Sequence, residues 1–285
     1  MTEDLTEEDK DLMARMRVTI PPKKAGRLEL LRFTVPENDV AAAAYYGVRT
    51  PQAGEYTKLV EHIPGHEKEG ILWMSDTPAE LVDHLPAARR IADPSCKRVL
   101  INGLGLGCIA QLALSFDHVE HVDVVEQDLR VIKIVGRAMK AEYGDRFQVI
   151  HGDAYKMGWL LGPWDVVWHD IWPHIDEDNL IGMHILHEMY RTRCPWQGSW
   201  ALELCMMMQD VDRDLFKLVE QKEGKVPDVT HELWTTYQSY LEVEQHYAYF
   251  VEQGYHAAPR DGHPTPMDGL PDDIGRDGTI WRTFT

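Results

Sequence analysis

The sequence has few basic residues for its length. It holds 29 Lys and Arg against 47 Asp and Glu, which gives a formal net charge of -18. Because nucleic-acid binding normally begins with a basic surface, this balance disfavours a nucleic-acid partner. No apolar run approaches the roughly 20 residues that a membrane span needs, and the acidic residues 1–9 are unlike a secretory or transit peptide. We therefore expect a cytoplasmic protein that binds neither nucleic acid nor membrane.

Cysteine is also scarce, and its spacing argues against two common kinds of site. The four cysteines are Cys96, Cys108, Cys194 and Cys205, and no two of them form a Cys-x-x-Cys pair. This pattern predicts neither a zinc knuckle nor a disulfide framework, so all four are expected to be reduced. His184 and His187 would share one face of a predicted helix, but the spacing lacks a third well-placed ligand. We therefore assign no metal site.

The first part of the chain, residues 1–92, predicts an N-terminal arm and a small β-containing unit. The expected elements are a short amphipathic helix within residues 1–17 and strands at 28–35, 56–63 and 71–74. A helix is expected from Asp76 towards Ala92, because a cap residue and a proline stand at its start.

Residues 93–258 predict one α/β domain, because apolar runs alternate with helical patterns as in a parallel sheet. Candidate strands lie at 98–102, 119–126, 147–150, 164–168 and 199–204, and candidate helices at 108–116, 129–142, 179–193, 210–222 and 228–252. Near-continuous Val and Ile runs fit strands that are covered on both faces. The predicted fold class is therefore α/β, with a doubly wound Rossmann-like sheet, and residues 259–285 form a tail or lid rich in Pro, Gly and Asp.

A glycine-rich turn at the end of the first parallel strand is the strongest functional signal. Residues 99–102 run directly into Gly103-Leu104-Gly105-Leu106-Gly107, and a predicted helix follows. Backbone without side chains at this edge lets a ligand approach the main chain and the helix N-terminus. Glu126 ends the next strand about twenty residues later, where an acid can accept hydrogen bonds from both ribose hydroxyls of a nucleoside.

The same loop also permits a different interpretation. Residues 105–110 satisfy the G-x-G-x-x-A form of the dinucleotide fingerprint, which keeps a nicotinamide-dependent oxidoreductase open. The ends of the third and fourth strands favour an adenosyl cofactor instead. There Asp153 can hold an adenine amino group, and His169 and Asp170 supply polar groups where a reacting sulfonium would lie.

These segments resemble the successive motifs of class I S-adenosylmethionine-dependent methyltransferases, over roughly residues 70 to 205. The segments that carry the resemblance are 99–107, 124–128, 151–154 and 164–173. The order of parts resembles the spermidine-synthase-like group within that superfamily. A small β unit comes first, then a helix that contains Glu80 and ends in His84-Leu85-Pro86, and then the glycine loop. Residues 169–174 and 196–200 are also similar to uncharacterised methyltransferase-like proteins of bacteriophages and bacteria.

Three departures from the aminopropyl-transferring members bear on the reaction. Those members carry an acid in the glycine loop, where this chain has Leu106. They carry Tyr-His before the glutamate of the preceding helix, where this chain has Pro78 and Ala79, and a second acid where this chain has Trp172. A cationic polyamine would therefore meet too few carboxylates, which disfavours polyamine synthesis.

The motifs and the resemblance together predict one site. The cofactor-binding residues are expected to be Gly103, Gly105, Gly107, Glu126, Gln127, Asp153, Ala154 and Asp170. Asp170 is also the candidate catalytic residue, because an acid at the end of a central strand can accept a proton from a nucleophile or orient it. Four tryptophans could either line an aromatic pocket or pack in the core, and we favour the core. They are Trp168, Trp172, Trp196 and Trp200.

We expect a methyltransferase that uses S-adenosylmethionine and acts on a small-molecule or peptide acceptor, with a homodimer as the candidate assembly. Three alternatives stay open: a nicotinamide-dependent oxidoreductase, an aminopropyltransferase-like enzyme, and a non-catalytic interaction module that keeps the cofactor fold.

Overall fold

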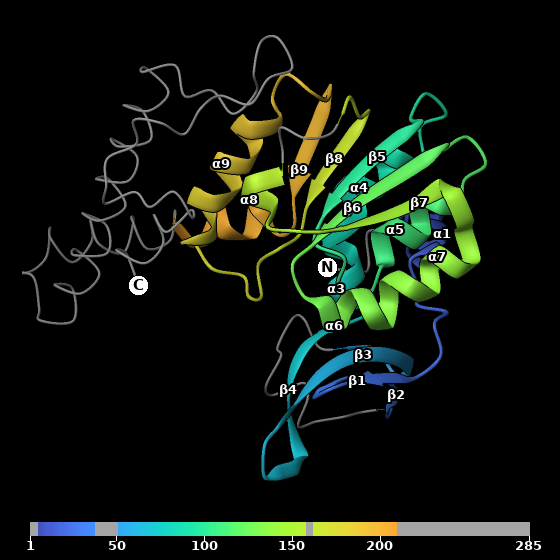
Figure 1. Ribbon diagram of the computed structural model, residues 1–285, viewed down its shortest axis with the longest axis vertical. Coiled ribbons are helices and arrows are strands. Elements are labelled where there is room, and N and C mark those ends of the chain that lie inside the picture. Colours follow the sequence, from blue (N-terminus) through green and yellow to red (C-terminus); the bar gives the residue numbers. More distant parts are fainter. Residues whose placement is uncertain (1–4, 38–50, 158–161, 210–285) are drawn as a thin grey trace, which may run out of the picture. The chain divides into compact units, whose positions relative to one another are not determined.

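The computed structural model describes residues 5–37, 51–157 and 162–209, and Figure 1 shows their helices and strands in sequence colours. The described residues divide into two compact units. The first unit holds both β-sheets, and the second holds helix α9 (Asn179–Tyr190) and the helical residues 202–209. The helices expected at 210–252 and the expected tail lie outside the described residues. Within the described part of the chain, no helix combines the length and the apolar character that a membrane crossing requires.

The N-terminal strands form a four-stranded antiparallel sheet in the order β1-β2-β3-β4. The strands are β1 (Lys23–Ala25), β2 (Leu28–Val35), β3 (Gly54–Ile63) and β4 (His66–Ser75). Leu28, Leu30 and Leu59 are fully buried, so this sheet covers part of the hydrophobic core. The three strands expected here are therefore present, and β1 is an additional short strand.

Helix α1 (Glu7–Arg15) confirms the amphipathic helix expected near the N-terminus. Thr6 and Asp9 form a reciprocal capping box, in which the Asp9 N–H donates to Thr6 Oγ1 at 3.1 Å and the Thr6 N–H donates to Asp9 Oδ2 at 3.2 Å. The buried side chains of Leu12 and Met13 belong to the core, and α1 packs against helices α4 (Leu85–Ile91) and α5 (Cys108–Leu114).

Asp76 has a different role from the one expected at a helix start. Its buried carboxylate accepts hydrogen bonds from the Val18 N–H at 2.9 Å and from the Thr57 N–H at 2.6 Å. It therefore joins β3 to the segment that follows α1. The helix itself begins two residues later, with Thr77 at the N-cap and Pro78 in the first turn.

This helical stretch is interrupted before it reaches Ala92. It consists of α3 (Pro78–Leu81), the 3-10 segment η2 (Val82–His84) and α4. Pro86 has no N–H, so it cannot donate to the carbonyl of residue 82, and the Leu85 N–H bonds to Val82 in the tighter 3-10 pattern instead.

The second sheet of the first unit has five parallel strands in the order β7-β6-β5-β8-β9. In chain order these strands are β5 (Arg98–Asn102), β6 (His121–Glu126), β7 (Phe147–His151), β8 (Val166–His169) and β9 (Trp196–Ser199). The order 3-2-1-4-5 reverses direction between β5 and β8, which is the point where open α/β sheets bind ligands. This topology confirms the predicted Rossmann-like fold class, and an antiparallel sheet accompanies it.

Helical segments connect these strands. Besides α5 they are α6 (Leu129–Val131), the π-helical segment η3 (Ile132–Gly136), α7 (Arg137–Tyr143), the 3-10 segment η4 (Gly144–Arg146) and α8 (Ala154–Met157). The inner residues of β5 and β6 are buried almost without interruption, as expected for strands covered on both faces.

The fifth parallel strand lies earlier in the sequence than the predicted range 199–204. Strand β9 spans Trp196–Ser199, and residues 202–209 are helical. Ala201 between them has a φ of 54°, and this left-handed backbone ends the extended conformation. An apolar run alone does not reveal such a turn, which is why the prediction of this strand was wrong.

Candidate functional site

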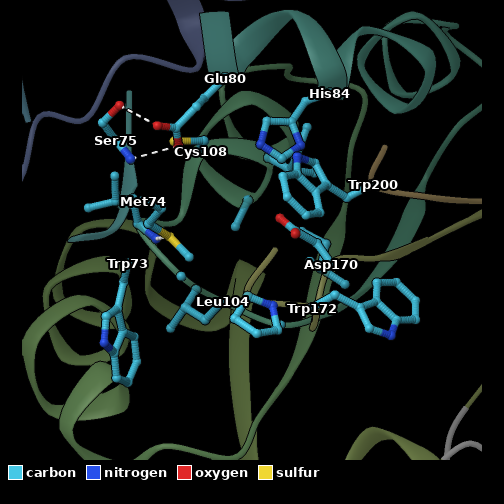
Figure 2. A pocket seen from close by; sticks show the side chains of 17 residues that line it. Trp73, Met74, Ser75, Glu80, His84, Leu104, Cys108, Asp170, Trp172 and Trp200 are labelled. Carbon is cyan, nitrogen blue, oxygen red and sulfur yellow. Dashed lines mark hydrogen bonds between the residues drawn. The ribbon is translucent and has the colours of Figure 1, made fainter. Parts of the chain in front are cut away.

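A cavity lies at the carboxyl ends of β5 and β8, where the strand order reverses. Figure 2 shows that its wall combines the glycine loop, the end of β4, the helical residues 80–84 and the segment after β8. Its lining residues include Met74, Glu80, His84, Gly105, Asp170 and Trp200. All of them belong to the first compact unit.

Each glycine of the loop has a positive φ and meets a different neighbour. A Cβ on Gly103 would overlap the carbonyl oxygen of Asp170, so this glycine lets the loop lie against the end of β8. A Cβ on Gly107 would lie 2.8 Å from Met139 Sδ and 3.1 Å from Val135 Cγ1. Gly107 therefore permits close packing between the start of α5 and the helical segment after β6, a requirement of the fold itself.

Met74 at the end of β4 lies directly on the glycine loop. The Leu106 N–H donates a hydrogen bond to Met74 Sδ at 3.2 Å, and a Cβ on Gly105 would lie 2.5 Å from the same sulfur. The antiparallel sheet thus supplies one wall of the cavity. No pattern in the local sequence connects Met74 to a loop some thirty residues later, so this contact could not be predicted from the sequence.

Glu126 holds the glycine loop and the end of β6 together. One carboxylate oxygen accepts a hydrogen bond from the Leu104 N–H at 2.8 Å, and the other accepts one from the Asp128 N–H at 2.7 Å. Two backbone bonds fix the orientation of this carboxylate. Each oxygen keeps a further lone pair that can accept a hydrogen bond.

Asp170 extends into the cavity from the end of β8, beside the indole of Trp200 (Figure 2). Its backbone N–H donates to the Asn102 carbonyl at 2.7 Å, which fixes its place next to the glycine loop. No described residue donates a hydrogen bond to its carboxyl group. Burial, reinforced by the negative charges of Glu80, Asp83 and Glu126, raises the pKa of Asp170 to about 7. The group can therefore take up or release a proton at neutral pH.

Two other polar side chains of the cavity bond to each other. The Glu80 carboxylate accepts hydrogen bonds from the Ser75 N–H at 2.7 Å and from Ser75 Oγ at 2.6 Å (Figure 2). This pair ties the end of β4 to helix α3. Glu80 therefore has a structural role in addition to the negative charge that it brings to the cavity.

His84 lines the cavity from the end of η2, and it is 9% exposed. Burial lowers the pKa of its imidazole to about 4, so the ring is neutral at neutral pH. Its ring lies edge to face with the indole of Trp168, with 6.1 Å between ring centroids.

The structure brings some of the predicted site residues together at the cavity. Gly103, Gly105 and Asp170 line it. The other five predicted site residues do not line the cavity, although they lie at the same edge of the sheet or just after the strands that end there. One of these five, Gly107, is the N-cap of α5. Those outside the wall are Gly107, Glu126, Gln127, Asp153 and Ala154.

The four tryptophans divide between core and cavity. Trp168 is 1% exposed and belongs to the core, and Trp196 packs against it with nearly parallel rings. Trp172 and Trp200 line the cavity, so the favoured core interpretation is wrong for Trp172. Trp200 both lines the cavity and packs against the core. The difference arises because Trp172 lies three residues after His169, the last residue of β8, where the alternation of a strand no longer determines the direction of the side chain.

Comparison with known proteins supports the resemblance read from the motifs. No family model matches the chain. A polyamine aminopropyltransferase from Agathobacter rectalis is 37% identical over 73 residues, which cover 24% of this chain and 25% of that protein. The match thus spans about a quarter of the relative's length. It confirms the resemblance to the spermidine-synthase-like group.

Two solved structures show how distant the structural neighbours are. A spermidine synthase from Thermotoga maritima is 18% identical with a TM-score of 0.35, over 60% of this chain and 52% of that one. A putative caffeoyl-CoA O-methyltransferase from Staphylococcus aureus is 19% identical with a TM-score of 0.32, over 41% of this chain and 52% of that one. At such scores the superpositions carry no argument, and the fold class rests on the strand order of the parallel sheet.

Proposed function

We propose that the chain is an S-adenosylmethionine-dependent methyltransferase that acts on a small-molecule or peptide acceptor. The observation that carries the proposal is the carboxyl group of Asp170. It extends into an aromatic-lined cavity beside the glycine loop, and no described residue donates a hydrogen bond to it.

The residues at the sheet edge fit an adenosyl cofactor. Glu126 is held rigidly by two backbone bonds and retains lone pairs for two ribose hydroxyls. Asp153 follows β7 at the same edge, where it would hold the adenine amino group. When bound, the cofactor would supply a methyl carbon made electrophilic by a positively charged sulfur.

Asp170 would act on the acceptor in two ways. As a carboxylate it accepts a hydrogen bond from the attacking group and turns that group's lone pair towards the methyl carbon. It can also take the proton that the acceptor loses, because its pKa of about 7 matches neutral pH. The indoles of Trp172 and Trp200 line the same cavity and reduce the access of water.

The packing of the glycine loop disfavours the nicotinamide alternative. In the dinucleotide fingerprint, the second glycine lets the backbone approach a pyrophosphate. Here that position is Gly107, whose Cβ direction points at Met139 and Val135, and the first position, Gly105, is in contact with Met74. A pyrophosphate would have to displace side chains from the loop, whereas a sulfonium cofactor places no phosphate there.

Aminopropyl transfer is the second candidate, because the 73-residue match is to a polyamine aminopropyltransferase. The site offers little support for it. Leu106 replaces the loop acid of those enzymes and lines the cavity, where its buried apolar side chain presents no charge to a polyamine. Trp172 replaces a second acid and lines the cavity.

Isothermal titration of the full chain separates these candidates. We expect S-adenosylmethionine and S-adenosylhomocysteine to bind in the micromolar range, and NAD and decarboxylated S-adenosylmethionine to bind at least about ten-fold more weakly. Tighter binding of the decarboxylated compound would favour aminopropyl transfer, and tighter binding of NAD would favour an oxidoreductase. Binding of S-adenosylmethionine without any turnover across a panel of acceptors would favour a non-catalytic module.

A further inference from the structure

Two buried ring nitrogens next to the cavity have no hydrogen-bond partner among the described residues. They are His84 Nδ1 and Trp168 Nε1. The two rings are neighbours, with centroids 6.1 Å apart and planes inclined at 71°. Buried polar atoms in native proteins are nearly always bonded, so two such atoms on adjacent rings require an explanation.

The chemistry of the two atoms makes them a natural donor and acceptor. The indole Nε1–H can only donate. The buried imidazole is neutral, so one of its nitrogens carries a hydrogen and the other a lone pair. A lone pair on Nδ1 accepts a hydrogen bond from the indole N–H after a small ring rotation. A hydrogen on Nδ1 would instead bring two donors together without an acceptor.

With this pairing, the hydrogen of His84 is on Nε2. Because Nδ1 is enclosed and the ring lines the cavity, the opposite edge of the imidazole faces the cavity (Figure 2). Because Trp168 is 1% exposed and belongs to the core, its indole N–H stays beside His84 and, in this pairing, favours this tautomer. The cavity wall thus contains the neutral donor His84 Nε2–H as well as the titratable carboxyl group of Asp170.

We propose that His84 binds the methyl acceptor, that its Nε2–H donates a hydrogen bond to an uncharged oxygen of that acceptor, and that Trp168 is a positioning residue which fixes the donor tautomer. The inference rests on the proposed function, because it concerns the acceptor in the same cavity. It narrows the substrate class to molecules without a negative charge that carry a carbonyl, hydroxyl or ether oxygen in addition to the nucleophile at Asp170.

The charges around the cavity favour a neutral oxygen over a carboxylate. Glu80, Asp83 and Glu126 all act on the nearby Asp170 as negative charges. An acceptor carboxylate would be repelled by the same groups, whereas a carbonyl or ether oxygen accepts the bond from His84 without that repulsion. Trp172 and Trp200 provide flat apolar surfaces for the rest of the molecule.

The first test is the tautomer itself, measured by 15N NMR of histidine-labelled full-length protein. We expect His84 to be protonated on Nε2 alone from pH 5.5 to 8.5. In Trp168→Phe, which removes the indole N–H, the preference for this tautomer should weaken. Protonation on Nδ1 in the wild type, or an unchanged tautomer in the variant, would overturn the inference.

The second test uses two probe ligands that differ in one oxygen, acetophenone and ethylbenzene, in the presence of S-adenosylhomocysteine. One neutral hydrogen bond predicts that acetophenone binds about five-fold more tightly. We expect this preference to be lost in His84→Ala and kept in His84→Gln, whose side-chain amide can donate near the position of Nε2. Equal preference in the wild type and in folded His84→Ala contradicts the proposal.

Either proposal can fail without the other. If S-adenosylhomocysteine does not bind, the proposed function fails, and the tautomer measurement still decides the arrangement of His84 and Trp168. If S-adenosylhomocysteine binds but the probes bind equally well, only the role of His84 fails. Should His84→Ala not fold, His84→Gln and Trp168→Phe still provide the comparison.

Discussion

Asn102 and His169 are joined by a hydrogen bond of 2.8 Å between Nδ2 and Nδ1, and both side chains are fully buried. The amide donates to Nδ1, so Nε2 carries the imidazole hydrogen and can donate to Gln197 Oε1 at 3.2 Å. Asn102 of β5 and His169 of β8 are register partners, and Gln197 lies on β9 opposite Val167. The chain of bonds therefore fixes the sheet edge one residue before Gly103 and Asp170.

Replacing Asn102 by Ala should destabilise the protein by about 1–3 kcal/mol, because the hydrogen bond between these two buried side chains is lost. Urea denaturation monitored by circular dichroism measures this change. The matched control is Gln148→Ala on the exposed side of β7, which should change stability by less than about 0.5 kcal/mol. Equal effects of the two substitutions would show that the buried bond adds nothing to stability.

The activity should depend on the protonation of Asp170. Because its pKa is raised to about 7, the carboxylate is available above this pH and is lost below it. We expect kcat to fall about ten-fold per pH unit below 7, and Asp170→Asn to reduce kcat by about 10²-fold or more and to remove this pH dependence. Initial rates of S-adenosylhomocysteine formation between pH 5.5 and 8.5 measure it. A flat wild-type profile would contradict both roles assigned to the Asp170 carboxylate.

Asp170 should also make the folded protein less stable at high pH. Its pKa is raised to about 7 in the folded protein, and the carboxyl ionises near pH 4 in an unfolded chain, so the folded state binds the proton more tightly between these values. Stability due to this group therefore falls as the pH rises from about 4 to 7. Asp170→Asn should be more stable than the wild type at pH 8, and the difference should vanish near pH 4. Equal stability at pH 8 would contradict the buried environment assigned to this carboxyl group.

The parts of the site that follow directly from local sequence could be predicted. The strand at 98–102, the glycine loop and Asp170 were found because a buried strand, a turn and a helix start leave contiguous patterns. The contacts of Met74 and His84 could not be found in this way. Met74 meets Leu106 across 32 positions, and His84 meets Trp168 across a still longer separation, so each contact depends on how whole elements pack.

The helix and strand ends show the same limit at shorter range. Asp76 has the residue type and position of a helix cap, yet its carboxylate bonds to Val18 and Thr57, because a buried acid bonds to whichever backbone donors the tertiary structure brings near. Likewise, the apolar run after Trp200 favours a strand, but the left-handed backbone of Ala201 turns it into a helix.

The ion pair of Asp9 and Arg89 should make the protein sensitive to acid. Arg89 Nε lies 2.8 Å from the buried Asp9 carboxylate, and this hydrogen bond, with the bonds to Thr6, lowers the pKa of Asp9 to about 2. The stabilisation is complete above about pH 4 and is lost as the pH falls towards 2. Arg89→Met should therefore lower stability by about 1 kcal/mol at pH 7 and have little effect at pH 2. Lys10→Met, at an exposed ion pair with Glu7, is the control and should show no such difference. A pH-independent effect of Arg89→Met would point to packing of its side chain instead.

Gly103 should tolerate no side chain, because of its left-handed backbone and because of its close contact with Asp170. Gly26, which has only the first of these features, is the control. Its φ is +96°, and a Cβ would overlap the carbonyl oxygen of Asp170 and lie 2.7 Å from the carbonyl carbon. Gly26 also has a left-handed backbone, with a φ of +62°, but nothing lies within 4 Å of its Cβ position. Gly26→Ala should therefore cost only the backbone strain of about 1–2 kcal/mol, whereas Gly103→Ala must also push the loop away from β8.

We expect Gly103→Ala to destabilise the fold by roughly 3 kcal/mol or more and to abolish binding of S-adenosylhomocysteine, with thermal unfolding and calorimetry as the two measurements. Gly26→Ala should leave that binding unchanged, because Gly26 lies in the turn between β1 and β2. If Gly103→Ala were no more destabilising than Gly26→Ala, the loop and the end of β8 could separate freely. Asp170 would then lack the fixed position beside the glycine loop on which its proposed role depends.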